Sequence, residues 1–398
     1  GRDNQFAPFW SVGLAWNVNR EKFWTGTGSM KIRASVGSVG SSKFSADQAL
    51  TRFVYNSDGE YNGIYGAELL QYGNTALKWQ NTLKYNLGLD MTVWKNIITL
   101  NFDAYLERTE NLLMDVDVAP STGFTSYKEN MGSLDNKGIE ARLRLNLLRG
   151  DDKGWNWNVT LSASHERDKI RKLSNAMKAM NAEAMKIENN TDSTSVFTMY
   201  EVGRSQKALM LVKSLGIDPA TGNELYLKRD GSTTFDYDPN DRVEVGNTTP
   251  KIQGFINTNL SWNHIELYMA FNYEYGAKIY NSTLAQKVEG ASPYQNADKR
   301  VLYDRWKKPG DIAMFRRIDD QGPVYQSSRL VQKNNYIRMS SLSLTYDIPR
   351  EKLARTFIER CKFTFSMTDV FRISSIKQER GTSYPFARTM SFSLAVEF

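Results

Sequence analysis

The last eleven residues of the chain constrain its fold more than any other segment. Apolar residues occupy every second position there, so their side chains share one face of an extended strand. The chain ends on an aromatic residue. A strand of this length, apolar on one face and ended by an aromatic, is typical of the closing strand of an outer-membrane β-barrel. The residues on the shared face are Met390, Phe392, Leu394, Val396 and Phe398.

The composition of the chain is compatible with such a barrel. Aromatic residues make up 12% of the 398 residues and the mean hydropathy is -0.52, which together suit a barrel with a polar interior. The sequence has no run of about 18 apolar residues, so it encodes no transmembrane helix. The single Cys361 excludes a disulfide framework within the chain. The net charge is +7, but the Lys and Arg residues are scattered along the chain and form no continuous basic block. Nucleic-acid binding is therefore not expected.

Residues 82–107 show the strand pattern most clearly, because polar and apolar residues alternate on both sides of Lys95 and Asn96. A period of two predicts two strands joined by a tight turn, long enough to cross a membrane. We expect one face to meet lipid through Leu83, Leu87, Leu100, Phe102, Leu143 and Phe392. We expect the other to line a polar lumen through Lys84, Asn86, Asp90, Glu140, Arg142 and Arg144.

The same alternation recurs along the whole chain and predicts about eleven strands. Besides the pair in 82–107, the predicted strands are 10–18, 30–36, 139–147, 155–163, 256–262, 265–275, 342–348, 361–367 and 389–398. The fold class is therefore all-β, an antiparallel transmembrane barrel segment without a separate domain.

The lengths of the connections separate a membrane barrel from a soluble β-sandwich. Short turns alternate with long loops at about 40–78, 166–250 and 276–335, as they do when one barrel end faces the periplasm and the other the outside. Trp94, Trp155, Trp262 and Tyr346 each lie beside a short turn, where a periplasmic aromatic girdle belongs. In a sandwich these aromatics would instead cap the core. We expect the long loops to form an extracellular rim.

Motifs for chemistry are weak. The two histidines have no Cys or second His at ligand spacing, and no nucleophile, base and oxyanion set is apparent. The segment Asp236–Asp241 fits either a solvated acidic turn or a loop that binds calcium. Residues 177–186 have helical composition, and we expect their methionines to pack rather than to hold a cofactor. No cofactor and no catalytic residue is therefore assigned.

Short motifs along nearly the whole chain resemble the C-terminal part of SusC/RagA-type TonB-dependent transporters. Each motif is weak alone, and their order and spacing carry the resemblance. Asp369 departs from it, because the family usually has asparagine there. The matching segments are 120–124, 130–132, 136–140, 216–222, 246–250, 305–306, 309–311, 336–338 and 346–349.

The resemblance implies the bacterial outer membrane and the energised import of bulky nutrients, oligosaccharides or peptides, with glycans favoured. It implies a SusD-like surface lipoprotein as a lid, the TonB complex, and contact with membrane lipid and lipopolysaccharide. The alternative is an outer-membrane barrel enzyme or a structural assembly barrel. Four loop aromatics and one acidic residue are candidates for contact with the ligand or the lid. The aromatics could stack on a ligand or pack locally, and the acid could cap a turn. These residues are Tyr61, Tyr65, Tyr294, Trp306 and Asp311.

The family also carries an N-terminal plug, a TonB-interacting segment and a barrel of about 22 strands. The plug, the TonB-interacting segment and the first barrel strands have no match in this sequence. Residues Gly1–Phe6 do not have the pattern of a signal peptide. Eleven strands would leave two open edges in lipid, which is costly. We therefore expect the partners of the first and last strands, and the plug, to lie in a missing N-terminal half.

Overall fold

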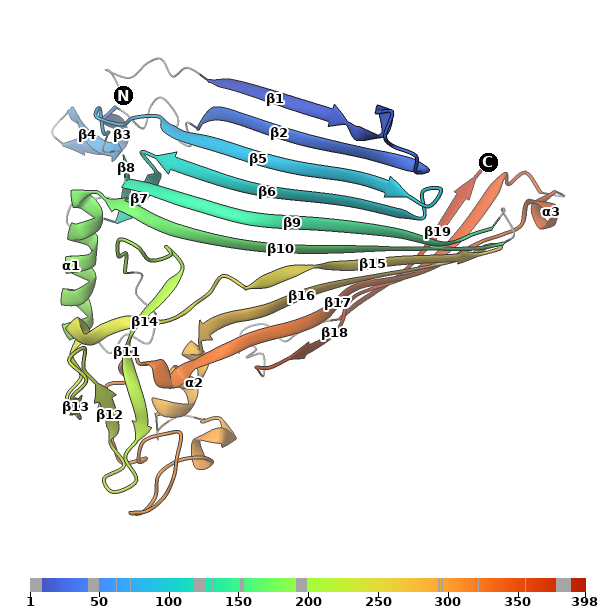
Figure 1. The fold of residues 1–398 in the computed structure, drawn as a ribbon. Helices are drawn as coiled ribbons and strands as arrows, with labels where there is room; N and C mark the ends of the chain where they lie inside the picture. Colours follow the sequence, from blue (N-terminus) through green and yellow to red (C-terminus); the bar gives the residue numbers. More distant parts are fainter. Residues whose placement is uncertain are drawn as a thin grey trace.

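The computed structural model describes residues 9–41, 50–61, 63–71, 73–117, 126–130, 132–150, 154–190, 199–292, 294, 296–320, 322–354, 356–376 and 388–398. Eleven strands within these residues form one curved antiparallel sheet, in which neighbours in space follow one another in order along the chain (Figure 1). In sheet order they are β1 (Trp10–Asn17), β2 (Gly28–Ser41), β5 (Gln80–Val93), β6 (Ile98–Glu110), β9 (Gly132–Arg149), β10 (Trp155–Leu173), β15 (Ile252–Trp262), β16 (Ile265–Tyr280), β17 (Val331–Asp347), β18 (Arg360–Ser374) and β19 (Thr389–Glu397).

The register of these strands agrees with the alternation in the sequence. Leu87 lies between Ala34 of β2 and Ala104 of β6, while Asp90 lies beside Asn101 on the opposite face. Side chains on strands alternate between the two faces, so each such pair fixes a whole row. The predicted eleven strands and the hairpin around Lys95 are confirmed.

Several strands run further than the sequence pattern indicated. β10 continues to Leu173 and β17 begins at Val331, whereas the apolar alternation covers only 155–163 and 342–348. The backbone ladder continues past the apolar segment, because hydrogen bonding between strands does not require an apolar face. The extra strand segments are rich in Lys, Arg, Asn and Glu.

One end of the sheet carries the short turns and an aromatic girdle. Trp155 and Trp262 stack with ring centroids 5.3 Å apart, and Phe357 stacks on Phe398 at 5.5 Å. The short helix α3 (Arg350–Leu353) and the chain's C-terminal end lie at this end (Figure 1). Phe398 therefore shares an end with the short turns. Such rings suit the boundary between water and lipid.

The other end carries the long connections and most of the remaining structure (Figure 1). A four-stranded sheet lies there in the order β13-β12-β11-β14. The elements at this end are β3 (Arg52–Tyr61), β4 (Ile64–Gln71), β7 (Leu113–Asp117), β8 (Ser126–Asn130), α1 (Asn175–Asn190), β11 (Ala208–Ile217), β12 (Glu224–Leu227), β13 (Thr233–Thr234), β14 (Arg242–Asn247), α2 (Ser282–Leu284), and the short helical turns Pro239–Asp241, Ala285–Glu289, Lys299–Leu302 and Ser328–Leu330.

Helix α1 contains the predicted helical segment 177–186. Met177 is buried and packs against Met114, Leu173, Met180 and Tyr200. An unbranched thioether fills such irregular gaps well. The prediction that these methionines serve packing agrees with this contact.

A buried cluster joins the long connections 199–251 and 281–330 into one unit, here called the outer module. Leu211 of β11 is fully buried against Tyr280 and Leu330, which lie where β16 ends and β17 begins. Val288 and Phe315 complete the centre of this cluster. The outer module is thus packed onto the barrel strands by apolar contact as well as by the chain.

Beside the apolar cluster, the Arg329 guanidinium binds two carboxylates from different connections. It lies 2.9 Å from Glu224 and 3.0 Å from Glu289, and all three side chains are at most 5% exposed. Arg316 also binds Glu289, at 2.8 Å. Burial alone would raise the pKa of Glu289, but Arg329 and Arg316 outweigh it and hold that pKa below its ordinary value.

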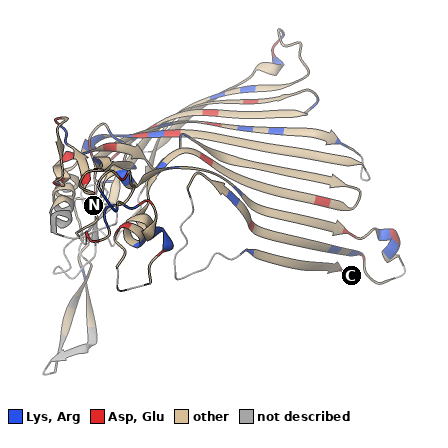
Figure 2. Cartoon of the chain, turned by 90° about the horizontal axis from the view of Figure 1, so that it is seen from below, with Lys and Arg blue, Asp and Glu red and all other residues tan. Residues whose placement is uncertain are grey.

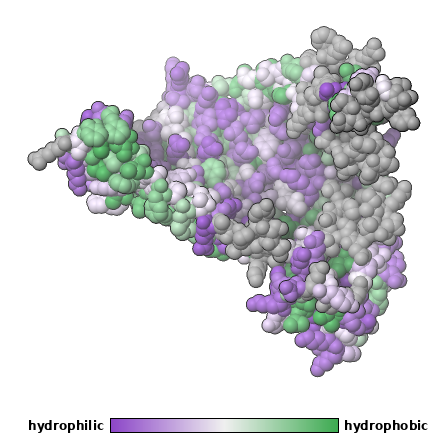
Figure 3. All heavy atoms as spheres, turned by 180° about the vertical axis from the view of Figure 1, so that it is seen from behind, coloured by the Kyte–Doolittle hydropathy of each residue, from purple (hydrophilic) through white to green (hydrophobic). Residues whose placement is uncertain are grey.

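The two faces of the large sheet differ in character. Charged residues gather at the outer end and along particular strands (Figure 2), and hydrophilic residues cover the hollowed face (Figure 3). Leu87 and Phe392 of the opposite face are 54% and 83% exposed. No helix among the described residues is both long and apolar enough to cross a membrane.

Candidate functional site

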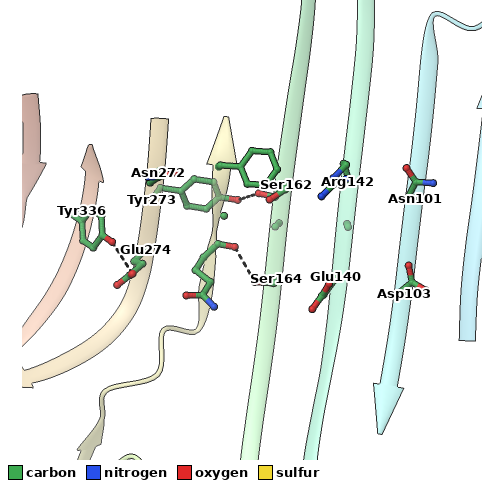
Figure 4. A pocket seen from close by; sticks show the side chains of 15 residues that line it. Asn101, Asp103, Glu140, Arg142, Ser162, Ser164, Asn272, Tyr273, Glu274 and Tyr336 are labelled. Carbon is green, nitrogen blue, oxygen red and sulfur yellow. Dashed lines mark hydrogen bonds between the residues drawn. The ribbon is translucent and has the colours of Figure 1, made fainter. Parts of the chain in front are cut away.

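The concave face of the sheet carries a polar belt that crosses six neighbouring strands, β6, β9, β10, β15, β16 and β17 (Figure 4). The belt lines a hollow of about 660 Å³. Strand register places its side chains in two rows. The first row contains Asn101, Arg142, Ser162, Phe255 and Asn272, and the second contains Asp103, Glu140, Ser164, Gln253, Glu274 and Tyr336.

One end of the belt is fixed by an aromatic hydrogen bond. The Tyr336 hydroxyl donates to the Glu274 carboxylate over 2.7 Å. The Arg372 guanidinium lies over the Tyr336 ring, 3.9 Å from its centroid, a favourable cation–π geometry. Arg338 binds Asp369, whose φ of 54° is in the region that Asn and Asp tolerate best. Aspartate therefore fits this position, where the sequence departs from the family's asparagine.

The other end is fixed by one arginine shared between two carboxylates. Arg33 of β2 lies 2.8 Å from Asp90 and 3.1 Å from Asp103. Asn86 donates to Asp103 and Asn101 donates to Asp90, at 3.0 and 2.8 Å. These bonds hold three strands, β2, β5 and β6, in register and occupy both carboxylates.

Two charged side chains in the middle of the belt remain available. Glu140 has no ion pair or side-chain hydrogen bond within the described part of the chain. Arg142 lies over the Phe255 ring at 5.8 Å and has no carboxylate partner among the same residues. With the amides of Gln253 and Asn272, these groups offer donors, acceptors and both charges to a solute in the hollow.

The structure places every predicted lumen residue on this concave face. Lys84 forms an ion pair of 2.7 Å with Glu107, and Arg144 lies in the row of Thr99 and Thr160. No sequence-based prediction covers the part of the belt on β15, β16 and β17. Alternation around the Asn263–His264 turn could have found it, since Gln253 and Glu274 face each other across that hairpin.

Two of the predicted loop candidates, Trp306 and Asp311, lie together. The Trp306 indole donates to the Pro219 carbonyl over 2.9 Å, and a Cβ on Gly222 would come within 2.6 Å of its ring. The Asp311 carboxylate accepts from the backbone amides of Lys307 and Lys308, at 3.1 and 3.0 Å. Trp306 thus packs against a neighbouring turn, and Asp311 caps its own turn.

The remaining candidates lie elsewhere on the outer end. Tyr294 is 94% exposed on the connection that follows the turn Ala285–Glu289. Tyr61 and Tyr65 belong to the separate β3–β4 hairpin, where Tyr61 pairs with Ile64 and Tyr65 with Glu60. Contact of these residues with ligand or lid stays a prediction.

The acidic segment Asp236–Asp241 forms a capped turn. Asp238 accepts from the Asn240 amide over 2.9 Å, and Asp241 accepts from the Arg229 amide over 3.0 Å. Among the residues that the structure describes, no three His, Cys, Asp or Glu side chains are grouped to hold a metal ion. Calcium binding by this loop stays a prediction.

Known proteins share the fold of this sheet. Residues 1–192 match the family model described as TonB dependent receptor-like, beta-barrel. The solved structure of the RagAB peptide transporter superposes on 94% of this chain with a TM-score of 0.77 and 20% sequence identity. The fold is that of a TonB-dependent receptor barrel. This confirms the predicted fold class and the resemblance to SusC/RagA-type proteins.

The curated relatives agree with this fold assignment. TonB-dependent receptor P3 of Formosa agariphila is 26% identical over 92% of this chain, and SusC of Bacteroides thetaiotaomicron is 28% identical over 43% of it. The chain spans less than half of the matched proteins, 37% of the first, 18% of the second and 41% of the RagAB chain. The barrel belongs to the outer membrane, and its relatives are receptors and transporters rather than enzymes, as predicted.

Proposed function

We propose that this barrel is part of a TonB-dependent transporter that imports bulky oligomeric nutrients, oligosaccharides or peptides. The observation that carries the proposal is the polar belt, which presents unpaired charges, amides and aromatic rings to a hollow in the barrel wall. Several weak, exchangeable contacts suit a solute that must both bind and leave. A catalytic site would need a convergent nucleophile and base instead.

The proposed partners follow from the same assignment. A SusD-like surface lipoprotein would meet the outer module, whose packed core and buried ion pairs make a firm docking surface. TonB would act through an N-terminal segment of the kind that the SusC/RagA resemblance implies. Membrane lipid and lipopolysaccharide would surround the opposite face.

Growth of cells that carry or lack the full-length gene tests the proposal. We expect loss of growth on one class of oligomer, and the same loss in cells without TonB. Oligosaccharides are the first class to test on the SusC resemblance, with peptides in parallel because the RagAB structures are those of a peptide transporter. Unchanged growth on all glycans and peptides would favour a structural or assembly barrel.

A matched pair of variants locates the solute contacts. Arg142→Gln removes an available charge in the belt, so uptake of a limiting substrate should fall several-fold. Lys95→Gln removes an exposed charge from a short turn and should leave uptake unchanged. Equal effects of the two substitutions would place the contacts outside the belt.

A further inference from the structure

The outward face of β6, β9 and β10 carries a cluster of five cations near the outer end of the sheet. In one row Leu106, Lys137 and Arg167 lie side by side, and in the next row Arg108, Asp135 and Lys169 do so. Arg171 follows on β10. This cationic cluster, Arg108, Lys137, Arg167, Lys169 and Arg171, surrounds the carboxylate of Asp135.

The charge of the cluster is only partly neutralised. Asp135 binds Arg108 at 3.1 Å and Arg171 at 3.6 Å. Lys137, Arg167 and Lys169 are exposed and have no ion pair with any carboxylate in the described ranges. The cluster therefore keeps three cations for an outside partner.

The cluster sits at the height where membrane phosphates lie. Trp155 and Arg167 are on the same face of β10, and twelve residues of strand at about 3.3 Å each, tilted by about 40°, rise roughly 30 Å. The apolar band of such a barrel is about 25 Å tall. Trp155 marks the girdle at the short-turn end, so Arg167 lies just past the opposite edge of the band.

The surface around the cluster continues the lipid-facing wall below it. Leu106, which belongs to the row of Lys137, is 39% exposed. Ile139, one row further toward the middle of the sheet, is 48% exposed. A hollow of about 750 Å³ opens beside them, with Lys137, Arg167 and Lys169 on one side. Of the other carboxylates in its lining, Glu166 pairs with Lys207, Glu244 pairs with Arg204, and Asp168 accepts from Ser205. The segment 246–251 forms its other side, where β10 and β15 no longer pair. Acyl chains and a charged headgroup could thus contact one continuous surface.

We propose that this cluster is a binding site for the phosphate groups of an outer-leaflet glycolipid. A lipid supplies both the chains that the apolar wall requires and the anions that the cations require, whereas a free anion would use only the second. Lysine and arginine are the side chains that bind phosphate oxygens most strongly. This site is independent of the solute that the barrel transports.

The test uses the purified full-length transporter, titrated in detergent with fluorescent diphosphorylated lipid A. The triple variant Lys137→Gln, Arg167→Gln, Lys169→Gln removes the three available cations. At about fivefold in lipid affinity per basic residue, we expect affinity to fall on the order of 100-fold. The matched control, Lys22→Gln, Lys95→Gln, Lys352→Gln, removes three exposed lysines at the short-turn end and should bind as the parent does.

Four further arms make the result decisive. Dephosphorylated lipid A should bind the parent weakly, and Arg167→Lys should restore most of the affinity that Arg167→Gln loses. Heat-modifiable migration in electrophoresis confirms that each variant forms a folded barrel. Equal affinity of the cluster variant and the parent, or equal binding of dephosphorylated lipid A, would overturn the site. Displacement of the lipid by inorganic phosphate at matched concentration would show a free-anion site and overturn the lipid assignment.

Discussion

Tyr336 and Glu274 face each other across β17 and β16, and the tyrosine hydroxyl donates a hydrogen bond of 2.7 Å to the carboxylate. Both side chains lie in the concave belt, where water can replace a lost partner. Tyr336→Phe should therefore cost about 1 kcal/mol or less and leave barrel assembly intact. Thermal unfolding of the full-length protein checks this, and a loss of assembly would mean that the hydroxyl is needed for folding.

The lipid-facing rows should be far less tolerant than the belt. Leu87 projects from the convex face, whereas Asn86 projects into the belt and donates to Asp103. An arginine at the bilayer midplane costs about 2 to 4 kcal/mol on the lipid face. Leu87→Arg should impair assembly and Asn86→Arg should not, as measured by the folded fraction in outer membranes. Similar folded fractions would contradict the assigned orientation.

The buried ion pairs should matter more than exposed ones of similar length. Arg329→Met leaves Glu224 and Glu289 buried without their shared cation, which should destabilise the outer module by about 3 to 5 kcal/mol. Arg317→Met breaks an exposed pair with Asp319 and should cost at most about 1 kcal/mol. Limited proteolysis of the outer loops measures both, and equal protection in the two variants would count against the network.

The same network predicts how the outer module responds to acid. Glu289 has its pKa held below the ordinary value of 4.5. Its ion pairs therefore stabilise the folded state fully above that value, and this stability is lost as the pH falls through the lower folded pKa. Protease resistance of the outer module should persist down to the ordinary carboxyl pKa and be lost only at lower pH. Glu289→Gln should flatten this dependence.

The contact between Trp306 and Gly222 can be isolated by two glycine substitutions. Gly222 and Gly231 both have positive φ, 75° and 88°, so alanine costs each about 1 to 2 kcal/mol of backbone strain. A Cβ at Gly222 also meets the Trp306 ring, whereas Gly231 has open space around it. Gly222→Ala should thus expose Trp306 and red-shift its fluorescence, and Gly231→Ala should not. A red shift in both variants would place the cause in the backbone.

Alternation alone predicted the strands because membrane crossing imposes it. In 83–93 each apolar residue must meet lipid, so the period of two is unbroken and both the strand and its faces can be read. Beyond the membrane that requirement ends. The sequence therefore did not show that β10 reaches Leu173 or that β17 begins at Val331.

The candidate site was predicted only in part, because its charged residues are more conspicuous in the sequence than its neutral ones. Glu140 and Arg142 stand out because charge alternates with leucine there, while Ser162, Gln253 and Tyr336 are neutral and less conspicuous on their strands. The pairing of Arg329 with Glu224 joins residues more than a hundred positions apart, and no local pattern encodes it. The motif at 120–124 lies outside the described residues.

Arg329 also determines how the outer surface can move. Glu224 and Glu289 belong to different connections, yet one guanidinium holds both, so neither connection can swing while the other stays in place. The surface above β16 and β17 is therefore one connected unit rather than a set of independent loops. Tyr280 and Leu330 pack into the buried cluster of this unit where β16 ends and β17 begins. A force on the unit is therefore transmitted directly to these two barrel strands.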